Sequence, residues 1–255
     1  MADSVAALVL AAGAGTRLAP LTRLRPKPLC PVGDVALVDH ALARAAALVG
    51  DDPSGLSVNA HAHADQILEH VAGRAHVSVE PGDEALGVGG AVGFLRPWLD
   101  GRAVVLVNGD TWSTIPLDPL LDGWDGERVR VLVQGPPGTE AAPGVPVVAS
   151  VLPWAVAARI PAEVLGITNG VWWPEKEAGR LDWAAVEGDL VSCDRPRDYL
   201  AANLLASGGR SVIGAGAEVE GEVVRSVVWP GQRVEAGERL VDAVRASSDV
   251  TVLVR

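Results

Sequence analysis

A regular alternation between short apolar runs and segments with helical spacing extends from Val5 to Asp110. Alternation of this kind is typical of βαβ units, in which parallel strands form a central sheet and helices connect them. It therefore predicts an α/β fold. The predicted strands are 6–10, 56–58, 77–79 and 103–107, and the predicted helices are 38–48, 64–71 and 91–99.

The predicted strands end at residues rich in Gly, Asp or Asn. In an open α/β sheet, ligands bind beyond the carboxyl ends of the strands. Gly13 follows the first predicted strand, and Asp110 follows the strand at 103–107. We therefore expect both residues at a ligand-binding edge.

Composition limits the partners and the compartment. The chain has 21 Lys and Arg against 32 Asp and Glu, a net charge of -11, which argues against phosphate-neutralising contacts with nucleic acid. Two cysteines, Cys30 and Cys193, are too few for a disulfide framework in 255 residues. The sequence shows neither a signal-peptide pattern nor an apolar run long enough for a membrane helix. We expect a cytoplasmic protein with no nucleic-acid or membrane partner.

The middle of the chain gives a weaker signal. Gly- and Pro-rich segments between Asp118 and Val147 predict loops. A strand followed by a helix is expected within 147–160. A further helix is expected over Pro196–Ala206, before the break at Ser207-Gly208-Gly209.

Aliphatic residues recur at steps of six after this break, with glycines between them. They form two runs, Ile213 and Val219, and then Val228, Val234 and Leu240. This spacing resembles the hexapeptide repeat of a left-handed parallel β-helix, in which each aliphatic side chain enters a narrow core; a glycine-rich hairpin tail is the alternative. We expect a main domain over residues 1–207 and a short β-helix tail over 208–255. Because about two coils leave exposed ends, a homodimer is the expected assembly.

Residues 10–29 carry the groups best suited to bind phosphate. Gly13-Ala14-Gly15 follows a buried strand, where glycines let backbone amides approach an anion. Arg17 supplies a bidentate donor, and Lys27, one of only two lysines in the chain, supplies a point charge. The segment is neither a Walker loop nor a dinucleotide fingerprint, because GxxxxGK[ST] is absent and Leu18 replaces the third glycine.

The same residues resemble the signature LxxGxGTRLxPLTxxxPKPL of the sugar-1-phosphate nucleotidyltransferases. Three further segments match this family in the expected order. They are Asn59-Ala60-His61, the E-x-L-G loop at 84–91 with Val88 in place of Thr, and Asn108-Gly109-Asp110. The resemblance implies a three-layer αβα, Rossmann-like nucleotidyltransferase domain.

The resemblance also implies a reaction, in which a sugar 1-phosphate attacks the α-phosphate of a nucleoside triphosphate and pyrophosphate leaves. It implies Mg²⁺ as cofactor, held by Asp110, and a catalytic set of Arg17, Lys27 and Asp110. The nucleotide-binding set that it implies is Leu10, Ala11, Ala12, Gly13, Ala14, Gly15, Thr16, Arg17, Lys27, Glu84, Gly89, Gly90, Asn108 and Asp110.

Two residues of the family pattern are missing. Ser192 occupies the position of the second metal-binding aspartate, and a neutral hydroxyl is a poor substitute for a carboxylate around Mg²⁺. Asp194 lies two residues further on, on the same side of an extended segment. No lysine occurs between Arg130 and Val148, where the family holds the sugar phosphate. A catalytically impaired, nucleotide-sugar-binding regulatory homologue is therefore the alternative to an active enzyme.

The base and the sugar remain open at this point. The tail favours GTP with mannose 1-phosphate, as in mannose-1-phosphate guanylyltransferases, and the short middle segment favours UTP with N-acetylmuramate 1-phosphate. Val147–Val151 stands where the family often carries a sugar-facing segment. Trp172 and Trp173 are predicted to pack in a core or interface, and Lys176 is predicted to lie in a solvated turn.

Overall fold

The computed structural model describes residues 4–140, 142 and 144–254. Its contacts divide the chain into two compact units, each assembled from segments that are distant in the sequence. Unit 1 comprises the residues up to 13, 41–109 and 113–190, and unit 2 comprises 14–40, 110–112 and the residues from 191. The predicted boundary between residues 207 and 208 stays a prediction.

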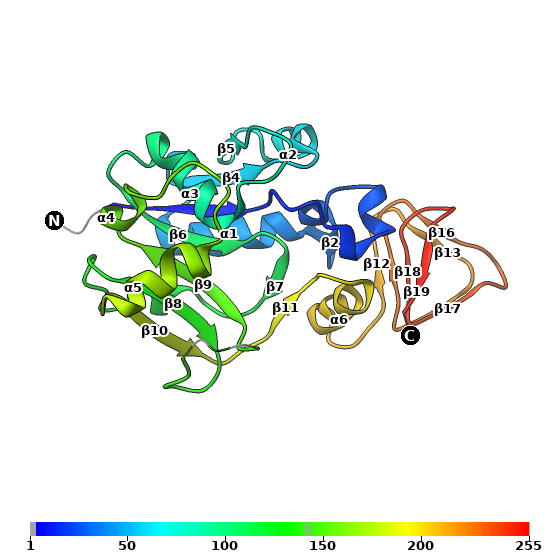
Figure 1. Cartoon of the computed structure of the whole chain (residues 1–255). Coiled ribbons are helices and arrows are strands. Elements are labelled where there is room, and N and C mark those ends of the chain that lie inside the picture. Colours follow the sequence, from blue (N-terminus) through cyan, green and yellow to red (C-terminus); the bar gives the residue numbers. More distant parts are fainter. Residues whose placement is uncertain (1–3, 141, 143, 255) are drawn as a thin grey trace. The chain divides into compact units, whose positions relative to one another are not determined.

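A seven-stranded sheet forms the centre of unit 1, in the order β10-β8-β9-β6-β1-β4-β5 (Figure 1). Its strands pair in parallel, except that β9 is antiparallel to both β6 and β8. The α/β class predicted from the alternation is therefore confirmed. The strands are β1 (Val5–Leu10), β4 (Leu56–Ala60), β5 (His76–Val79), β6 (Ala103–Asn108), β8 (Val129–Gln134), β9 (Val147–Leu152) and β10 (Leu181–Val186).

Three helices connect the parallel strands: α1 (Leu37–Val49), α2 (Ala64–Val71) and α3 (Gly87–Leu99). Right-handed crossovers place α1 and α2 on one face of the sheet, because β1, β4 and β5 follow one another in one direction. The chain then returns past β1 to β6, so α3 covers the opposite face. Burial from both sides explains why β1 is apolar throughout.

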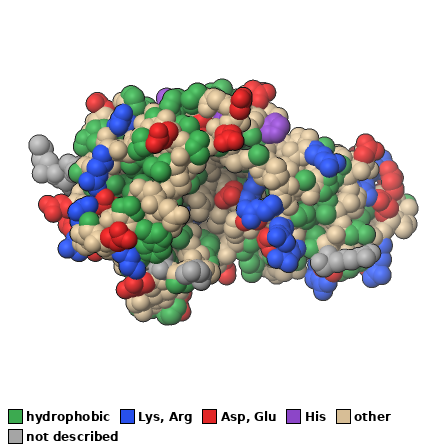
Figure 2. Space-filling model, in the orientation of Figure 1, with side chains coloured by type: hydrophobic (Ala, Val, Ile, Leu, Met, Phe, Trp, Pro, Cys, Tyr) green, Lys and Arg blue, Asp and Glu red, His purple; other side chains and the backbone are tan. Residues whose placement is uncertain are grey.

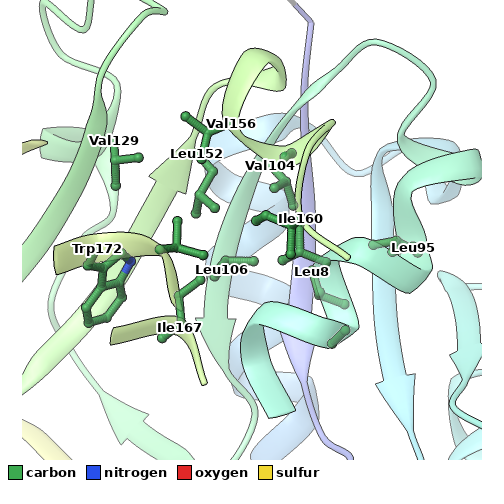
Figure 3. Packing of buried hydrophobic residues seen from close by; sticks show 14 of the residues in the cluster. Leu8, Leu95, Val104, Leu106, Val129, Leu152, Val156, Ile160, Ile167 and Trp172 are labelled. Carbon is green, nitrogen blue, oxygen red and sulfur yellow. The ribbon is translucent and has the colours of Figure 1, made fainter. Parts of the chain in front are cut away.

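The largest core cluster lies on the face that α3 covers, and Figure 3 shows part of it. Leu8 and Leu106 project from the sheet toward Leu95 of α3 and toward Ile160. Trp172 belongs to this cluster and is 8% exposed, which confirms its predicted packing role. The remaining helical segments of this face are α4 (Trp154–Ala157), a π-helical turn (Thr168–Trp172) and α5 (Trp173–Glu177).

The segment 118–147 contains a full strand, β8, that the weak sequence signal did not predict, because β9 and β10 pair with it from later in the chain. The Gly- and Pro-rich segment that begins at Gly135 lies between β8 and β9, as expected of a loop. One expectation needs correction. The helix expected within 147–160 is only the four-residue α4. The other short elements are β7 (Thr111–Ser113), β11 (Leu190–Ser192) and single 3-10 turns at Pro53–Gly55 and Asp118–Leu120.

Unit 2 packs α6 (Pro196–Ala206) and three 3-10 turns on a second core. The turns are Thr16–Leu18, Leu21–Arg23 and Lys27–Leu29, followed by the small hairpin of β2 (Pro31–Val32) and β3 (Val35–Ala36). Leu18, Leu21, Tyr199 and Trp229 are fully buried in this core. The predicted helix at 196–206 is confirmed at both ends.

The C-terminal strands of unit 2 stack in parallel on three separate ladders, β12-β15-β18, β13-β16 and β14-β17. Only β19 pairs antiparallel, with β18. Stacked parallel strands are the pattern of repeated coils, and they contradict a simple hairpin tail. The strands are β12 (Val212–Ile213), β13 (Glu218–Val219), β14 (Glu222–Val224), β15 (Val227–Val228), β16 (Arg233–Val234), β17 (Arg239–Val241), β18 (Ala243–Arg245) and β19 (Thr251–Leu253).

The hexapeptide expectation is wrong for the first coil. Val228, Val234 and Leu240 are buried as predicted, but Ile213 and Val219 are 42% and 40% exposed. Their strands are the outer members of their ladders, so no further coil covers them. Acidic and basic side chains lie close together over these coils (Figure 2). Among them, Arg233 forms ion pairs with Glu218, Glu220 and Glu235.

Trp229 connects the coils to the loop that contains Lys27. Its indole Nε1 donates to the Tyr199 hydroxyl at 2.9 Å, and that hydroxyl donates to the carbonyl of Pro31. The guanidinium of Arg25 lies 4.4 Å from the centre of a Trp229 ring. The coils therefore support the segment on both sides of Lys27.

Trp229→Ala is expected to lower the free energy of unfolding by about 3–5 kcal/mol, because a large buried ring is lost. Trp229→Phe keeps the ring volume in part and loses the hydrogen bond, so about 1 kcal/mol is expected. Urea denaturation measures both, with Trp124→Phe at a partly exposed position as the control. A Trp229→Ala protein as stable as the control would contradict the supporting role.

Candidate active site

Lys27 forms the centre of a charged cluster in unit 2. Its Nζ donates to Asp110 Oδ2 and to Asp194 Oδ1, at 2.7 Å in each case. Lys27 is only 5% exposed, whereas the side chains of Asp110 and Asp194 are 37% and 28% exposed. Because both oxygens lie 2.7 Å from one nitrogen, they are at most twice that distance, 5.4 Å, apart.

Local structure explains how distant residues meet here. Pro26 and Pro28 flank Lys27 at the start of a 3-10 turn. The carbonyl of Asp110 accepts a hydrogen bond from the amide of Cys193 at 3.1 Å, which holds the segment with Asp194 beside it. Arg17 also contacts Asp194 Oδ1, at 3.0 Å, with a side chain that is 66% exposed. The structure thus places three predicted residues, Arg17, Lys27 and Asp110, around one further carboxylate.

The cluster shifts the pKa values of Lys27 and Asp194. Burial lowers the pKa of Lys27, but Asp110 and Asp194 outweigh this effect and raise it above the ordinary 10.5. Burial raises the pKa of Asp194, but Lys27 and Arg17 bring it below 3.8. Burial also raises the pKa of both thiols, Cys30 and Cys193, to about 12, so neither supplies a thiolate at neutral pH.

These shifts predict how stability depends on pH. The lowered pKa of Asp194 gives a contribution that is present above pH 3.8 and is lost as the pH falls through the folded-state value. The raised pKa of Lys27 gives a contribution that is complete below pH 10.5 and is lost as the pH rises through its folded-state value. Thermal unfolding between pH 3 and 8 should show a smaller acid-side fall for Asp194→Asn than for the wild type. Equal falls would contradict the ion pairs.

Gly15 makes room for Lys27. Its φ is +63°, and a Cβ atom built on it would lie 2.8 Å from Lys27 Cβ. Gly13, by contrast, has nothing within 4 Å of such an atom. The first glycine of the motif therefore leaves open space, and the second allows close packing of the lysine.

Gly15→Ala is expected to lower the melting temperature by about 3–8 °C, since strain at a left-handed residue costs about 1–3 kcal/mol. Gly13→Ala is the matched control and should change the melting temperature by less than about 2 °C. Differential scanning calorimetry separates the two variants. Equal melting temperatures would show that Gly15 has no packing role beside Lys27.

A buried hydrogen-bond network organises the predicted nucleotide loop of unit 1. The amide of Ala11 donates to Asn59 Oδ1 at 2.7 Å, and Asn59 Nδ2 donates to Glu80 Oε1 at 2.6 Å. The other oxygen of Glu80 accepts from the amide of Leu86 at 2.7 Å. Glu80 thereby joins the end of β1 to the loop before α3. Sequence reasoning missed Glu80, although its place directly after β5 was a usable signal.

The glycines at the start of α3 pack against the chain itself. The amides of Gly89 and Gly90 donate to the carbonyl of Leu165 at 2.9 and 3.3 Å. A Cβ on Gly90 would lie 2.1 Å from the carbonyl oxygen of Glu163. Residues 163–165 therefore fill the space beside Gly90, and the nucleotide-binding role of Gly89 and Gly90 stays a prediction. Glu84 is exposed, and its nucleotide-binding role stays a prediction.

The ends of β1 and β6 meet at one edge of the sheet. The amide of Gly109 donates to the carbonyl of Leu10 at 3.0 Å, and a Cβ at Gly109 would lie 2.7 Å from that oxygen. Leu10 and Asn108, both predicted site residues, are paired in register. The carboxyl ends of β1 and β6 therefore lie side by side in unit 1, and ligand binding at this edge stays a prediction.

Among the residues that the structure describes, no three His, Cys, Asp or Glu side chains gather into a metal-binding group. Asp110 and Asp194 nevertheless offer two carboxylates, and Mg²⁺ is commonly held by one or two carboxylates together with substrate phosphates. The donor set thus fits Mg²⁺ bound with a substrate.

Membrane-spanning helices are a separate question. None of the helices in the described part of the chain combines the length and the apolar composition that a membrane span requires.

Comparison with known proteins shows what the first half of the chain is similar to. Residues 6–126 match the family model described as nucleotidyl transferase. This match and the similarities given next support the resemblance to the sugar-1-phosphate nucleotidyltransferases.

Two curated relatives and one solved structure illustrate the similarity. The chain is 36% identical over 146 residues to N-acetylmuramate alpha-1-phosphate uridylyltransferase of Caulobacter vibrioides, covering 53% of this chain and 59% of that protein. It is 31% identical over 131 residues to mannose-1-phosphate guanylyltransferase of Mycobacterium tuberculosis, covering 51% and 36%. The chain thus spans roughly one to two thirds of the lengths of these two relatives. A structure titled mannose-1-phosphate geranyltransferase, from Thermus thermophilus, covers 98% of this chain and 95% of its own, with a TM-score of 0.72 and 18% identity, and shares the fold.

Proposed function

We propose that this chain is a Mg²⁺-dependent sugar-1-phosphate nucleotidyltransferase. The observation that carries the proposal is the Lys27 ammonium held between Asp110 and Asp194, beside the Gly-x-Gly loop. Arg17, Lys27 and Asp110 are the proposed catalytic residues. Asp194 supplies the second carboxylate that Ser192 lacks.

The proposed reaction forms one bond and breaks one. An oxygen of the sugar 1-phosphate bonds to the α-phosphorus of the nucleoside triphosphate, and the bond between that phosphorus and the bridging oxygen to the β-phosphate breaks. The electron pair leaves with pyrophosphate. Arg17 and Lys27 bind and neutralise phosphate oxygens, which is the main help that phosphoryl chemistry needs. Mg²⁺, when bound at Asp110 and Asp194, supplies further charge neutralisation.

The remaining predicted residues would hold the nucleotide. Leu10 ends β1 and residues 11–16 follow it, while Asn108 ends β6 just before Gly109 and Asp110. The Asn59–Glu80 network supports this proposal because it fixes Ala11 and Leu86 in defined positions.

The C-terminal strands form, in this proposal, a short left-handed parallel β-helix. The three parallel ladders and the fold shared along almost the whole chain support it. Residues 1–207 and 208–255 would then be the two domains, in a cytoplasmic homodimer.

An impaired regulatory homologue is the second candidate. Ser192 is exposed and neutral, and no lysine lies between Arg130 and Val148. The position of Asp194 beside Lys27 weakens the first of these two arguments.

Pyrophosphate release separates the candidates. The full-length protein is assayed in Mg²⁺ with each nucleoside triphosphate against mannose 1-phosphate, glucose 1-phosphate, N-acetylglucosamine 1-phosphate and N-acetylmuramate 1-phosphate. We expect turnover with at least one pair and its loss in Asp110→Asn. Tight nucleotide binding by calorimetry without turnover for any pair would favour the regulatory homologue.

A further inference from the structure

The two carboxylates of the Lys27 cluster already hold cations of the chain itself. Lys27 Nζ donates to Asp110 Oδ2 and to Asp194 Oδ1 at 2.7 Å, and Arg17 Nη2 donates to the same Asp194 oxygen at 3.0 Å. The other oxygen of Asp110 accepts a hydrogen bond from the Thr111 hydroxyl at 3.1 Å. All of these residues belong to unit 2. Both oxygens of Asp110 and one of Asp194 are therefore engaged by donors of the protein.

The charges of this cluster cancel. Lysine, arginine and aspartate side chains are ordinarily charged at neutral pH. Arg17 and Lys27 therefore balance Asp110 and Asp194. A divalent cation binds carboxylates through their uncompensated negative charge. The cluster by itself offers none, because its two side-chain cations together carry the same charge as one Mg²⁺ ion.

The fold holds Lys27 in this position. Its side chain is 6% exposed, Pro26 and Pro28 flank it, and a Cβ atom on Gly15 would lie 2.8 Å from Lys27 Cβ. A metal ion that took both carboxylates would leave the ammonium buried without a counter-charge, which is strongly unfavourable. Arg17 has a side chain that is 66% exposed and can turn to solvent with a much smaller loss. Lys27 is therefore the main obstacle to a metal ion.

A triphosphate removes this obstacle. Ammonium and guanidinium groups bind phosphate oxygens through charge-assisted hydrogen bonds. A triphosphate that binds Lys27 and Arg17 gives both cations new counter-charges and leaves the two carboxylates uncompensated. The triphosphate and the metal ion then strengthen each other's binding, because a coupling free energy between two sites is reciprocal.

We infer that Lys27, assisted by Arg17, is a resident cation that keeps divalent metal ions off Asp110 and Asp194 until a triphosphate draws both side chains away. The inference rests on the proposed function, because it takes the triphosphate as the ligand. It deepens that function by naming how metal binding is regulated. Lys27 has two successive sets of partners in this scheme, the carboxylates before the nucleotide binds and the phosphates afterwards.

Binding of Mn²⁺ to the protein without nucleotide tests the first half of the inference. Mn²⁺ prefers the same oxygen ligands as Mg²⁺, and electron paramagnetic resonance counts the free ion. In Lys27→Met, the Mn²⁺ dissociation constant should fall at least about tenfold, since one full charge a few ångströms from the carboxylates is removed. In Arg17→Met, a fall of about two- to fivefold is expected, because water screens the exposed guanidinium.

Two controls separate this effect from a change in net charge. Lys176→Met also removes a lysine that contacts a carboxylate, that of Glu140 at 3.8 Å, and should bind Mn²⁺ as weakly as the wild type. Lys27→Met combined with Asp194→Asn should lose the gained affinity if the ion is bound at the carboxylates. Thermal unfolding shows whether each variant is folded. Arg17→Met, changed at an exposed position, keeps the test valid if Lys27→Met unfolds.

The small number of lysines allows the second half of the inference to be followed directly. Nuclear magnetic resonance of the lysine ε-methylene groups gives signals from Lys27 and Lys176 alone, and Lys176→Met assigns them. A non-hydrolysable nucleoside triphosphate, added with a chelator that removes metal ions, should shift the Lys27 signal and leave that of Lys176 unchanged. Mg²⁺ added without nucleotide should shift neither signal.

Metal binding and turnover are scored separately. Tighter Mn²⁺ binding in Lys27→Met, with a Lys27 signal that moves with nucleotide alone, supports the inference even when no sugar phosphate releases pyrophosphate, in which case only the proposed turnover fails. A wild-type protein that binds Mn²⁺ without nucleotide as tightly as both Lys27→Met and Arg17→Met overturns the inference, as does a Lys27 signal that Mg²⁺ alone displaces. Pyrophosphate release by the wild type leaves the proposed function standing in either case.

Discussion

Lys27→Met should lower kcat/KM for pyrophosphate release by about 10²- to 10³-fold, the usual effect of removing one charge-stabilising donor. Methionine keeps the length of the buried stem but removes the ammonium between Asp110 and Asp194. The two carboxylates then repel each other and the incoming triphosphate. Steady-state kinetics gives the rate, and nucleotide calorimetry shows how much of the loss is binding.

The chain contains its own control for this substitution. Lys176 is the only other lysine, is 44% exposed, and lies 5.2 Å from the centre of a Trp173 ring. Lys176→Met should change kcat/KM by less than about twofold, since exposed charges contribute little. A Lys27→Met enzyme that retains more than a tenth of the wild-type value would remove Lys27 from the catalytic set.

Asp194→Asn should lower kcat by about 10²-fold and raise the Mg²⁺ concentration needed for half-maximal rate. The amide keeps the shape of the side chain but loses the charge that pairs with Lys27 and Arg17. Ser192→Asp should change kcat by less than about threefold, because a carboxylate already lies beside Lys27. Magnesium titrations of the initial rate measure both variants.

Asp198→Asn is the matched control, since it removes a carboxylate from the same segment at a position that pairs with Arg197 instead. It should leave kcat and the magnesium dependence near the wild-type values. A large gain in Ser192→Asp together with a nearly unchanged Asp194→Asn would show that Asp194 does not replace the missing aspartate.

Local patterns predicted the elements whose partners are close in the sequence. The βαβ alternation placed β1, β4 and β6, and α2 has the predicted limits. The alternation did not predict β8, because that strand pairs with β9 and β10, which come later in the chain. The six-residue repeat failed for Ile213 and Val219, because a repeat along the chain does not show whether another coil covers these side chains.

The site residues also divide into those that are close in the sequence, which could be predicted, and those that are distant, which could not. Gly15, Arg17 and Lys27 are close in the sequence and were found from their spacing. The contact of Asp194 with Lys27 joins residues 167 positions apart, so spacing alone offered it only as a conjecture. The position of Glu80 after β5 is visible in the sequence, but its partners Asn59 and Leu86 are known only from the hydrogen bonds of the fold.

Mass spectrometry of the products tests the central claim most directly. The full-length protein is incubated in Mg²⁺ with the four nucleoside triphosphates and a mixture of sugar 1-phosphates. The account predicts one dominant nucleotide sugar, with an equal amount of pyrophosphate, and neither product in Lys27→Met. Nucleoside diphosphate and inorganic phosphate as the only products, or no product at all, would contradict it.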